Sequence, residues 1–375
     1  MFSAKGCRFL IGLVVLASAA PSTFALLNID GNRNQLFVFG SASISYDSNV
    51  FSDSSERGDT STAFGAGVEY QRRAGILAVD VIGRVDYQRY NDFTDENAAN
   101  PRLEAKIAKT TGRTTGDINV RAYRESRSDS AVNLRTDSWN FPVDLNLRYP
   151  VNDKMYLTSA TGYVRRDYRG EATLVDYTDF SEAVDAFYVY TSKLDLSAGY
   201  RIRSSRTSIG ERANDHWFNV GATGGILAKL TGTVRVGFQI RDVRDGESYN
   251  QVNAMAGLAW PVTRKLNLNA EVTRDFNTIA TGASVDSTGA ALRAAYSITR
   301  KLDLSSGLSY GRNDFLDAAA GGRRDTFFGY DLGLDYRMND HFSFGATYAY
   351  FKNWSSLDFS DFDRQSFSVS VSTRY

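Results

Sequence analysis

Residues Tyr296–Phe315 read YSITRKLDLSSGLSYGRNDF and contain the pattern that decides the fold. A strand ending at Tyr296 is followed by a short polar turn, Ser297–Arg300, and then by a long second strand. The apolar side chains of this second strand share one face and are Leu302, Leu304, Leu308 and Tyr310. Its polar side chains share the other face and are Lys301, Asp303, Ser305, Ser309 and Asn313. Successive side chains of a strand point to opposite faces, so the stretch predicts a β-hairpin with one oily and one wet surface.

The same pattern recurs along the chain. The copies are WPVTRKLNLNAEVTRDF from Trp260, YRMNDHFSFGATYAYFKNW from Tyr336, YPVNDKMYLTSATGYVRRDY from Tyr149 and YVYTSKLDLSAGYRIRSS from Tyr188. A weaker copy, GILAKLTGTVRVGFQIRDV, fills the one longer gap. A repeat of this length can indicate a propeller blade, but each copy here holds two long strands instead of four short ones. The repeating unit is therefore predicted to be a hairpin.

The chain begins MFSAKGCRFLIGLVVLASAAPSTFA. Lys5 and Arg8 precede a short apolar run, Phe9–Leu16, and small residues follow it. This order predicts a cleaved secretory signal peptide over residues 1–25, because the run is too short for a spanning helix. The single cysteine, Cys7, would be removed with it, so no disulfide is expected in the remaining chain. No later stretch is long and apolar enough for a membrane-spanning helix.

Eighteen segments read as strands, with 16 strands as the alternative count, and together they predict one β-barrel domain over residues 26–375. The expected strands are Leu36–Phe51, Ser61–Tyr70, Ile76–Tyr90, Arg102–Thr110, Gly116–Arg127, Ser138–Tyr149, Met155–Tyr168, Phe180–Tyr190, Lys193–Ser205, Asp215–Ile226, Thr231–Val243, Tyr249–Trp260, Leu266–Phe276, Val285–Ile298, Lys301–Phe315, Asp325–Met338, His341–Trp354 and Phe362–Tyr375. Short and long connections alternate between them. Outer-membrane barrels have short periplasmic turns and longer external loops, so both termini are expected in the periplasm.

The two faces of the expected strands differ in polarity. One face carries apolar sets that end in Trp or Tyr, as at membrane interfaces, and these include Trp139/Phe141/Val143/Leu145/Leu147/Tyr149, Val234/Val236/Phe238/Ile240 and Phe328/Tyr330/Leu332/Leu334/Tyr336. The other face carries charges whose burial in a sandwich core would be costly. An all-β, up-and-down antiparallel transmembrane barrel is therefore predicted, and a soluble β-sandwich is the alternative.

A barrel of this strand number is wide enough to hold water, so charges on its inner face are the candidate site residues. The basic candidates lie in the middle strands and are Arg121, Arg148, Arg201, Arg203, Arg235 and Arg241. The acidic candidates lie in later strands and are Glu271, Asp275, Asp303, Asp331 and Asp335. They either set the selectivity of a pore or pair with one another and brace the wall. Inner glycines such as Gly237 and Gly307 either keep the lumen open or relieve crowding.

The chain ends in SFSVSVSTRY, in which Phe367, Val369, Val371 and Tyr375 alternate with polar residues. This ending resembles the C-terminal assembly signal of bacterial outer-membrane proteins, which implies the barrel-assembly machinery as a partner. The charge balance of 43 Lys+Arg against 43 Asp+Glu gives no support for a nucleic-acid partner.

Enzymatic chemistry has little support in the sequence. The only histidines are His216, expected at the outer rim, and His341, expected in a periplasmic turn, and neither belongs to a catalytic motif. No zinc spacing, phosphate-binding loop or dinucleotide fingerprint is present, so neither metal nor cofactor is expected.

The hexapeptide YDSNVF at Tyr46–Phe51 and the strand ends Arg84–Tyr87 (RVDY) and Arg166–Tyr168 (RDY) resemble an outer-membrane β-barrel porin family associated with exopolysaccharide gene clusters. The resemblance implies a Gram-negative outer-membrane pore that assists exopolysaccharide export, with polysaccharide, export machinery and outer-membrane lipid as partners. Two alternatives remain open at this point: a general diffusion porin for small solutes, and a structural or adhesion barrel acting through its loops.

Overall fold

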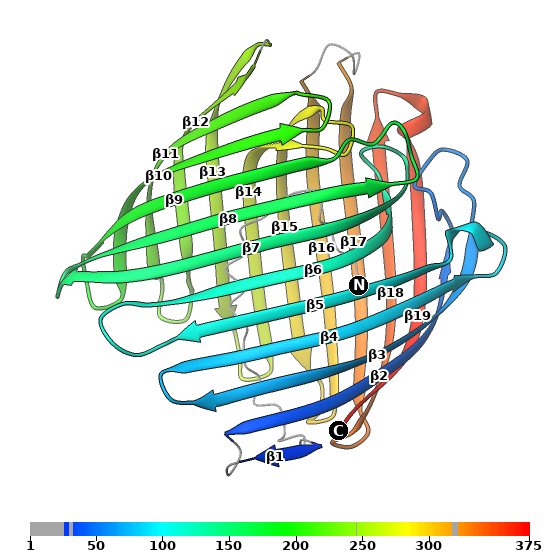
Figure 1. Ribbon diagram of the computed structural model, residues 1–375, viewed down its shortest axis with the longest axis horizontal. Coiled ribbons are helices and arrows are strands. Elements are labelled where there is room, and N and C mark those ends of the chain that lie inside the picture. The colour runs from blue at the N-terminus through cyan, green and yellow to red at the C-terminus, as the bar shows by residue number, and fades with distance from the viewer. Residues whose placement is uncertain (1–25, 30–32, 245, 317–321) are drawn as a thin grey trace.

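The computed structural model describes residues 26–29, 33–244, 246–316 and 322–375, and the expected signal peptide, residues 1–25, lies outside them. The described residues form one antiparallel sheet of 19 strands (Figure 1). The strands are β1 (Leu27–Ile29), β2 (Asn34–Asp47), β3 (Asp59–Ala74), β4 (Leu77–Tyr90), β5 (Ala98–Lys109), β6 (Thr115–Asp129), β7 (Leu134–Asn152), β8 (Met155–Arg169), β9 (Tyr177–Val189), β10 (Leu194–Thr207), β11 (Arg212–Gly225), β12 (Thr231–Val243), β13 (Ser248–Pro261), β14 (Leu266–Thr278), β15 (Ser284–Ser297), β16 (Leu302–Phe315), β17 (Arg324–Arg337), β18 (Phe342–Ser355) and β19 (Phe362–Arg374). Single 3₁₀ turns, η1 (Thr94–Glu96) and η3 (Asp358–Ser360), lie in two of the loops.

The sheet closes on itself. Each strand from β2 onward pairs with the next, and β19 pairs with β2 from Ser366↔Asp47 to Arg374↔Phe39. Closure satisfies the backbone N–H and C=O groups that an edge strand would leave unpaired. The barrel therefore has the eighteen strands β2–β19, as predicted, and the alternative count of 16 is wrong.

Most strand bounds differ from the prediction by a few residues, and one strand is additional. Strand β1 was not expected, and it pairs with β2 through Leu27↔Leu36. Strand β2 ends at Asp47, four residues before the predicted end at Phe51. It ends there because Asp47 Oδ1 accepts a hydrogen bond from the backbone N–H of Asn49 at 3.0 Å, and the chain then turns through Ser52 at φ 56°.

The two ends of the barrel differ in their connections. Short turns join β3 to β4, β15 to β16 and the other pairs at one end, where β2 begins and β19 finishes. The longer loops, such as residues 48–58 between β2 and β3, gather at the opposite end. The predicted alternation holds only in part, because the β6–β7, β10–β11 and β12–β13 connections at the long-loop end have four residues each, and the long loop predicted at Arg206–Asn214 is mostly strand. The assignment of the short-turn end to the periplasm stays a prediction.

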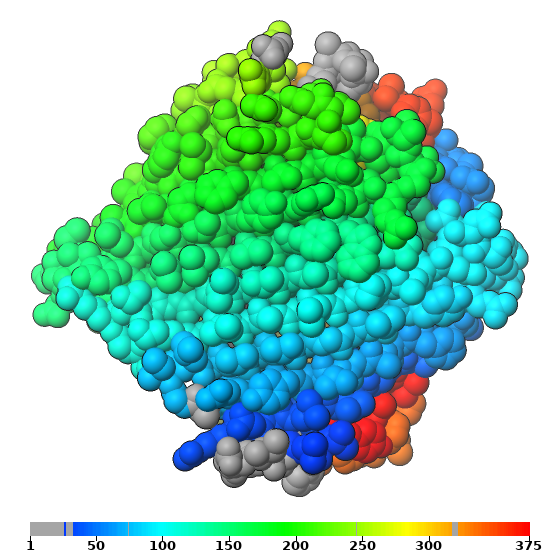
Figure 2. All heavy atoms as spheres, in the orientation of Figure 1, coloured from blue at the N-terminus to red at the C-terminus, as the bar shows by residue number. Residues whose placement is uncertain are grey.

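Apolar and polar side chains alternate along the strands, as the period of two predicts. Large apolar side chains such as Phe64, Phe238 and Leu332 lie exposed on the outside of the barrel, although water would disfavour this. Figure 2 shows the outer wall from the side of β3–β9, where side chains cover the strands. An apolar outer band around a closed barrel is the arrangement that lipid requires. No helix among the described residues is long and apolar enough to cross a membrane.

Gly237 on β12 relieves crowding between strands. A Cβ at Gly237 would lie 2.0 Å from the carbonyl oxygen of Phe218, whereas a Cβ at Gly257 on β13 would meet nothing within 4 Å. We expect Gly237→Ala to lower the free energy of unfolding by about 1–3 kcal/mol, because a backbone atom must move. Gly257→Ala is the control and should leave the urea midpoint of the folded barrel nearly unchanged. Equal midpoints for the two variants would contradict this role.

Candidate functional site: the pore constriction

The inner face of the barrel is packed at one end and open at the other. Toward the long loops, Arg241, Gln239 and Asn140 have at most 1% of their surface exposed, although strand alternation points them into the lumen. Toward the short turns, Arg148 and Asp335 lie on the same inner face and are exposed. The lumen is therefore water-facing in its short-turn half, and protein fills part of its long-loop half.

The first segment that fills the lumen is the tip of the β6–β7 hairpin, residues 124–137. Strands β5 and β6 pair only as far as Arg102↔Tyr123, whereas β6 and β7 remain paired to Asp129↔Leu134. The hairpin tip is thus released from its β5 neighbour and free to bend away from the wall. Around the ring of eighteen strands, β17 is seven strands from β6 through the β19–β2 closure, nearly on the opposite side.

The hairpin tip nevertheless contacts that opposite side. Arg323, just before β17, donates from Nη1 to the carbonyl of Ala131 at 2.8 Å and from Nη2 to the carbonyl of Ser130 at 3.1 Å. Asn133 donates from Nδ2 to the carbonyl of Ser52 at 2.7 Å, and its Oδ1 accepts from Ser360 Oγ at 2.6 Å. Contacts with loops on the far wall require the tip to lie across the mouth of the barrel.

Arg364 on β19 links the hairpin tip to the wall at the strand closure. Its guanidinium donates to Asp47 at 2.9 and 3.0 Å, to Ser52 Oγ at 3.2 Å and also to Ser128 of the tip. Ser52 Oγ in turn donates to Ser128 Oγ at 3.0 Å. One arginine therefore holds the end of β2, the β2–β3 loop and the hairpin tip together.

The YDSNVF motif forms the seat for this contact. Asn49 is fully buried, and its Nδ2 donates to the carbonyls of Asp53 at 2.7 Å and Asp363 at 3.2 Å. Val50 is also fully buried, and the Phe51 ring packs edge-on against Phe93 of the β4–β5 loop with 5.1 Å between ring centroids. The motif thus fixes the shape of the β2–β3 loop, which forms a ledge that contacts the hairpin tip through Ser52.

A second hairpin narrows the lumen from another side. Strands β13 and β14 pair only up to Arg274, whereas β14 and β15 stay paired to Thr278. The free end leans onto the wall of β8–β12: Arg241 Nη2 donates to Thr278 Oγ1 at 2.6 Å, and the backbone N–H of Val175 donates to the carbonyl of Ala280 at 2.8 Å. In Figure 1 this yellow hairpin lies beneath the green strands at the long-loop end.

A buried ion cluster attaches the second hairpin to the wall. Asp215 is fully buried and accepts from Arg203 Nε at 2.7 Å, with Arg241 Nε 3.7 Å away. Arg203 also lies 3.5 Å from the carboxylate of Asp275 on the hairpin, which accepts from Gln239 Nε2 at 3.0 Å. Because the cations and carboxylates come from β10, β11, β12 and β14, the cluster holds the hairpin against three strands of the wall.

The six basic residues that the sequence proposed all lie on the inner face, mostly beside a carboxylate or an aromatic ring. Arg121 pairs with Asp144, and Arg235 pairs with Asp185 at 2.8 Å. Arg203 and Arg241 belong to the cluster around Asp215, whereas the Arg148 and Arg201 guanidinium groups lie 4.0 Å and 4.2 Å from the ring centroids of Tyr156 and Trp217. The middle wall is therefore charged but largely neutralised.

The five acidic candidates also lie on the inner side and do not form one group. Asp275 is on the second hairpin, while Asp303 accepts from Arg337 Nη2 at 2.7 Å. Asp335 faces Asp303 in the register of β16 and β17, and Asp331 is placed beside Gly307. Glu271 is half-buried on β14. Only Asp275 belongs to the constriction, and the others line the wider part.

Sequence reasoning missed the residues that hold the hairpin tip, above all Arg323 and Arg364. Both lie near strand ends beside acidic residues, where a solvated loop is the ordinary interpretation. The only available signal was YDSNVF, whose polar residues interrupt an alternating strand and form the ledge.

The remaining predicted positions are placed as follows. His216 lies on the outer face, where its Nδ1 is 2.7 Å from Tyr200 Oη, and Asp215 points to the opposite face of β11. His341 stacks on Tyr375 with ring centroids 4.5 Å apart. Phe367 and Val369 are exposed on the outer face of the closing strand, which accords with a barrel end. Recognition of this end during assembly stays a prediction.

Comparison with known proteins agrees with this architecture. Residues 212–375 match the model of a family described as "Putative beta-barrel porin 2". The crystal structure of Pseudomonas aeruginosa OccK2 (OpdF) is similar, with a TM-score of 0.51, 10% identity, and coverage of 91% of this chain and 98% of that chain. The structure of OccK2 (OpdF) in complex with glucuronate gives a TM-score of 0.50, with 10% identity and the same coverage of 91% and 98%.

No curated protein sequence matches the chain. At such low identities the structural likeness shows the fold alone, and the membrane location follows from the closed barrel with its apolar outer band. The chain is therefore a porin-like β-barrel of the Gram-negative outer membrane, and its residues 212–375 match the putative beta-barrel porin 2 family.

Proposed function

We propose that the barrel is a passive channel for small hydrophilic solutes, with a width limited by its two inward hairpins. The observation that carries this proposal is the β6–β7 hairpin tip lying across the mouth, held by Arg323 and Arg364. A tip held by several hydrogen bonds at once reduces the cross-section without needing a ligand. Charged and polar side chains along the inner wall would keep the remaining passage wet.

The inner wall also favours polar solutes of modest size. In the short-turn half, the buried rings of Tyr156 and Phe187 stack with centroids 4.6 Å apart, and the Arg148 guanidinium lies 4.0 Å from the centroid of the Tyr156 ring. Tyr156 Oη donates to Asp195 at 2.7 Å. The exposed Arg148 and the half-buried Asp195 beside these rings offer hydrogen-bonding groups that suit hydroxylated solutes such as sugars. We propose no catalytic role for this wall.

Export of exopolysaccharide is the second candidate, and the resemblance carried by YDSNVF favours it. The hairpin tip lies across the mouth and is held on opposite walls. A polymer could therefore pass only if the tip left the mouth. In either case we propose that the short-turn end, with both termini, faces the periplasm.

Planar-bilayer conductance tests the proposal. The purified barrel should form discrete open channels, and vesicles containing it should admit monosaccharides and disaccharides while excluding longer oligosaccharides. A gene deletion should leave the amount of secreted polysaccharide unchanged.

Two results would decide against the channel. A folded barrel that conducts no ions would remove the small-solute function. Loss of secreted polysaccharide in the deletion strain, restored by the intact gene, would favour export.

A further inference from the structure

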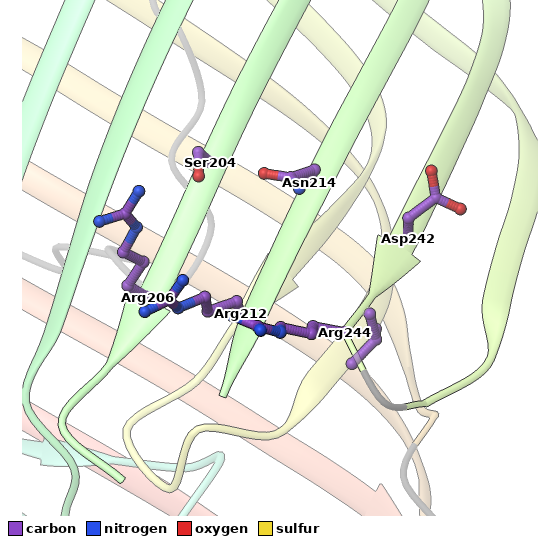
Figure 3. Close-up of a pocket in the computed structure, with 7 residues that line it drawn as sticks. Ser204, Arg206, Arg212, Asn214, Asp242 and Arg244 are labelled. Carbon is purple, nitrogen blue, oxygen red and sulfur yellow. The ribbon is translucent and has the colours of Figure 1, made fainter. Parts of the chain in front are cut away.

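Three arginines form a row on the outer face of the barrel at its long-loop end. Arg206 on β10 faces Arg212 on β11 in the strand register, and the backbone N–H of Arg244 donates to the carbonyl of Arg212 at 2.8 Å. All three side chains are exposed. Figure 3 shows them side by side along one edge of a shallow pocket of about 260 Å³.

The outward-facing side chains of β10, β11 and β12 align in rows across the three strands. Below the arginines, these rows change from polar to apolar toward the middle of the wall. The register aligns Ser204, Asn214 and Asp242 in the next outward row, and these residues line the same pocket. The following outward rows are Ile202, His216 and Ile240, and then Tyr200, Phe218 and Phe238. Aromatic rows mark the membrane interface, so the arginine row lies where lipid headgroups surround the barrel.

Two arginines of the row, Arg206 and Arg212, are not neutralised by a carboxylate partner among the described residues. Like charges placed directly opposite one another destabilise a sheet, and neither Arg206 nor Arg212 forms an ion pair within the described part of the chain. At the same end of the barrel, on β16 and β17, Arg312 and Arg324 lie 2.9 Å and 2.7 Å from Asp314. The charge of Arg206 and Arg212 is therefore unbalanced, whereas that of Arg312 and Arg324 is offset by Asp314.

The pocket contains one carboxylate, and it is already engaged. Asp242 Oδ1 accepts from Ser248 Oγ at 2.6 Å and lies one outward row nearer to the membrane than the arginines. A single carboxylate leaves a positive balance among the residues that line the pocket. Guanidinium groups bind phosphate through paired N–H donors, which makes an arginine row suited to phosphate groups.

We propose that this arginine row binds the phosphate groups of a phosphorylated glycolipid in the membrane leaflet around the long-loop end. The phosphates would lie in the pocket against Arg206, Arg212 and Arg244. The acyl chains would run down the outer face over the isoleucine and aromatic rows. This proposal is independent of what passes through the lumen, and the occupant is a lipid because an apolar surface follows the basic row after one intervening polar row.

Binding of diphosphoryl lipid A to the full-length barrel in detergent tests the proposal. The double variant Arg206→Gln/Arg212→Gln should bind diphosphoryl lipid A about 30-fold more weakly, since each surface arginine contributes about 1 kcal/mol toward anionic lipid. Monophosphoryl lipid A should bind the native barrel more weakly and should lose less in the variant. Raised salt should weaken binding to the native barrel.

The matched control is Arg312→Gln, an exposed outer arginine at the same end that already has a carboxylate partner. It should retain native lipid A affinity, and circular dichroism should show that each variant is folded. Unchanged binding in the double variant, or an equal loss in Arg312→Gln, would overturn the site. Inorganic phosphate that binds as tightly as diphosphoryl lipid A would overturn its assignment to a lipid.

Discussion

Shortening the β6–β7 hairpin should raise the single-channel conductance severalfold and admit larger sugars. The proposed variant replaces residues 126–137 by Asn-Gly, which joins the facing residues Glu125 and Ser138 through a two-residue turn. The change removes the segment that crosses the mouth while leaving the paired wall below it intact. Conductance and the size limit for sugars in vesicle-swelling assays are the measurements.

A milder variant separates loss of the hairpin tip from loss of its attachment. Arg323→Ala/Arg364→Ala keeps the tip and its Asn133 contacts but removes the arginine hydrogen bonds to it, so we expect fluctuating conductance between the native and widened values. Arg312→Ala on the outer face is the control and should conduct like the native barrel. If the shortened barrel conducts no more than the native one, the tip does not limit flow and the channel proposal loses its constriction.

Asp215→Ala should cause the largest loss of stability of any single substitution suggested by the structure. Asp215 is the fully buried carboxylate between Arg203 and Arg241, so its removal leaves two buried cations without their shared counter-charge. Breaking a buried ion pair in this way costs about 3–5 kcal/mol. Urea unfolding of the purified barrel, followed by tryptophan fluorescence, should show a lower midpoint.

Two further variants test whether the loss of stability in Asp215→Ala comes from the buried ion cluster. Asp335→Asn removes an exposed inner carboxylate at the wide end and should cost about 1 kcal/mol or less. Adding Arg241→Met to Asp215→Ala removes one unpaired cation and should recover part of the lost stability. If the urea midpoints of Asp215→Ala and Asp335→Asn were equal, the prediction would be wrong, and water would already reach the cluster around Asp215.

The wall of the barrel could be predicted from the sequence because its signals are local. The segment Thr231–Val243 is predicted and observed with identical bounds, since alternation along one strand requires no knowledge of its neighbours. The even count of strands came from reading eighteen segments of alternating polarity. Strand alternation and hairpin turns are both set by residues close together in the chain. The repeated hairpins could therefore be recognised from the sequence.

The constriction could not be predicted in the same way, because its contacts join residues far apart in the chain. Arg364 reaches Ser128 and Arg323 reaches Ala131, and no pattern in either segment indicates its partner. Alternation places Arg203, Asp215 and Arg241 on the inner face, but the registers of β10–β12 decide that they meet. The pairing of Arg206 with Arg212 likewise depends on register.

The sequence by itself determined a barrel with an oily outside and a wet inside, because a period of two is read within each strand. Only the tertiary structure decided that two hairpins leave the wall and lie in the lumen, and that YDSNVF forms the ledge for one of them. The physical reason is that a hairpin bends inward only where its neighbouring strand stops pairing with it and distant side chains satisfy its polar groups.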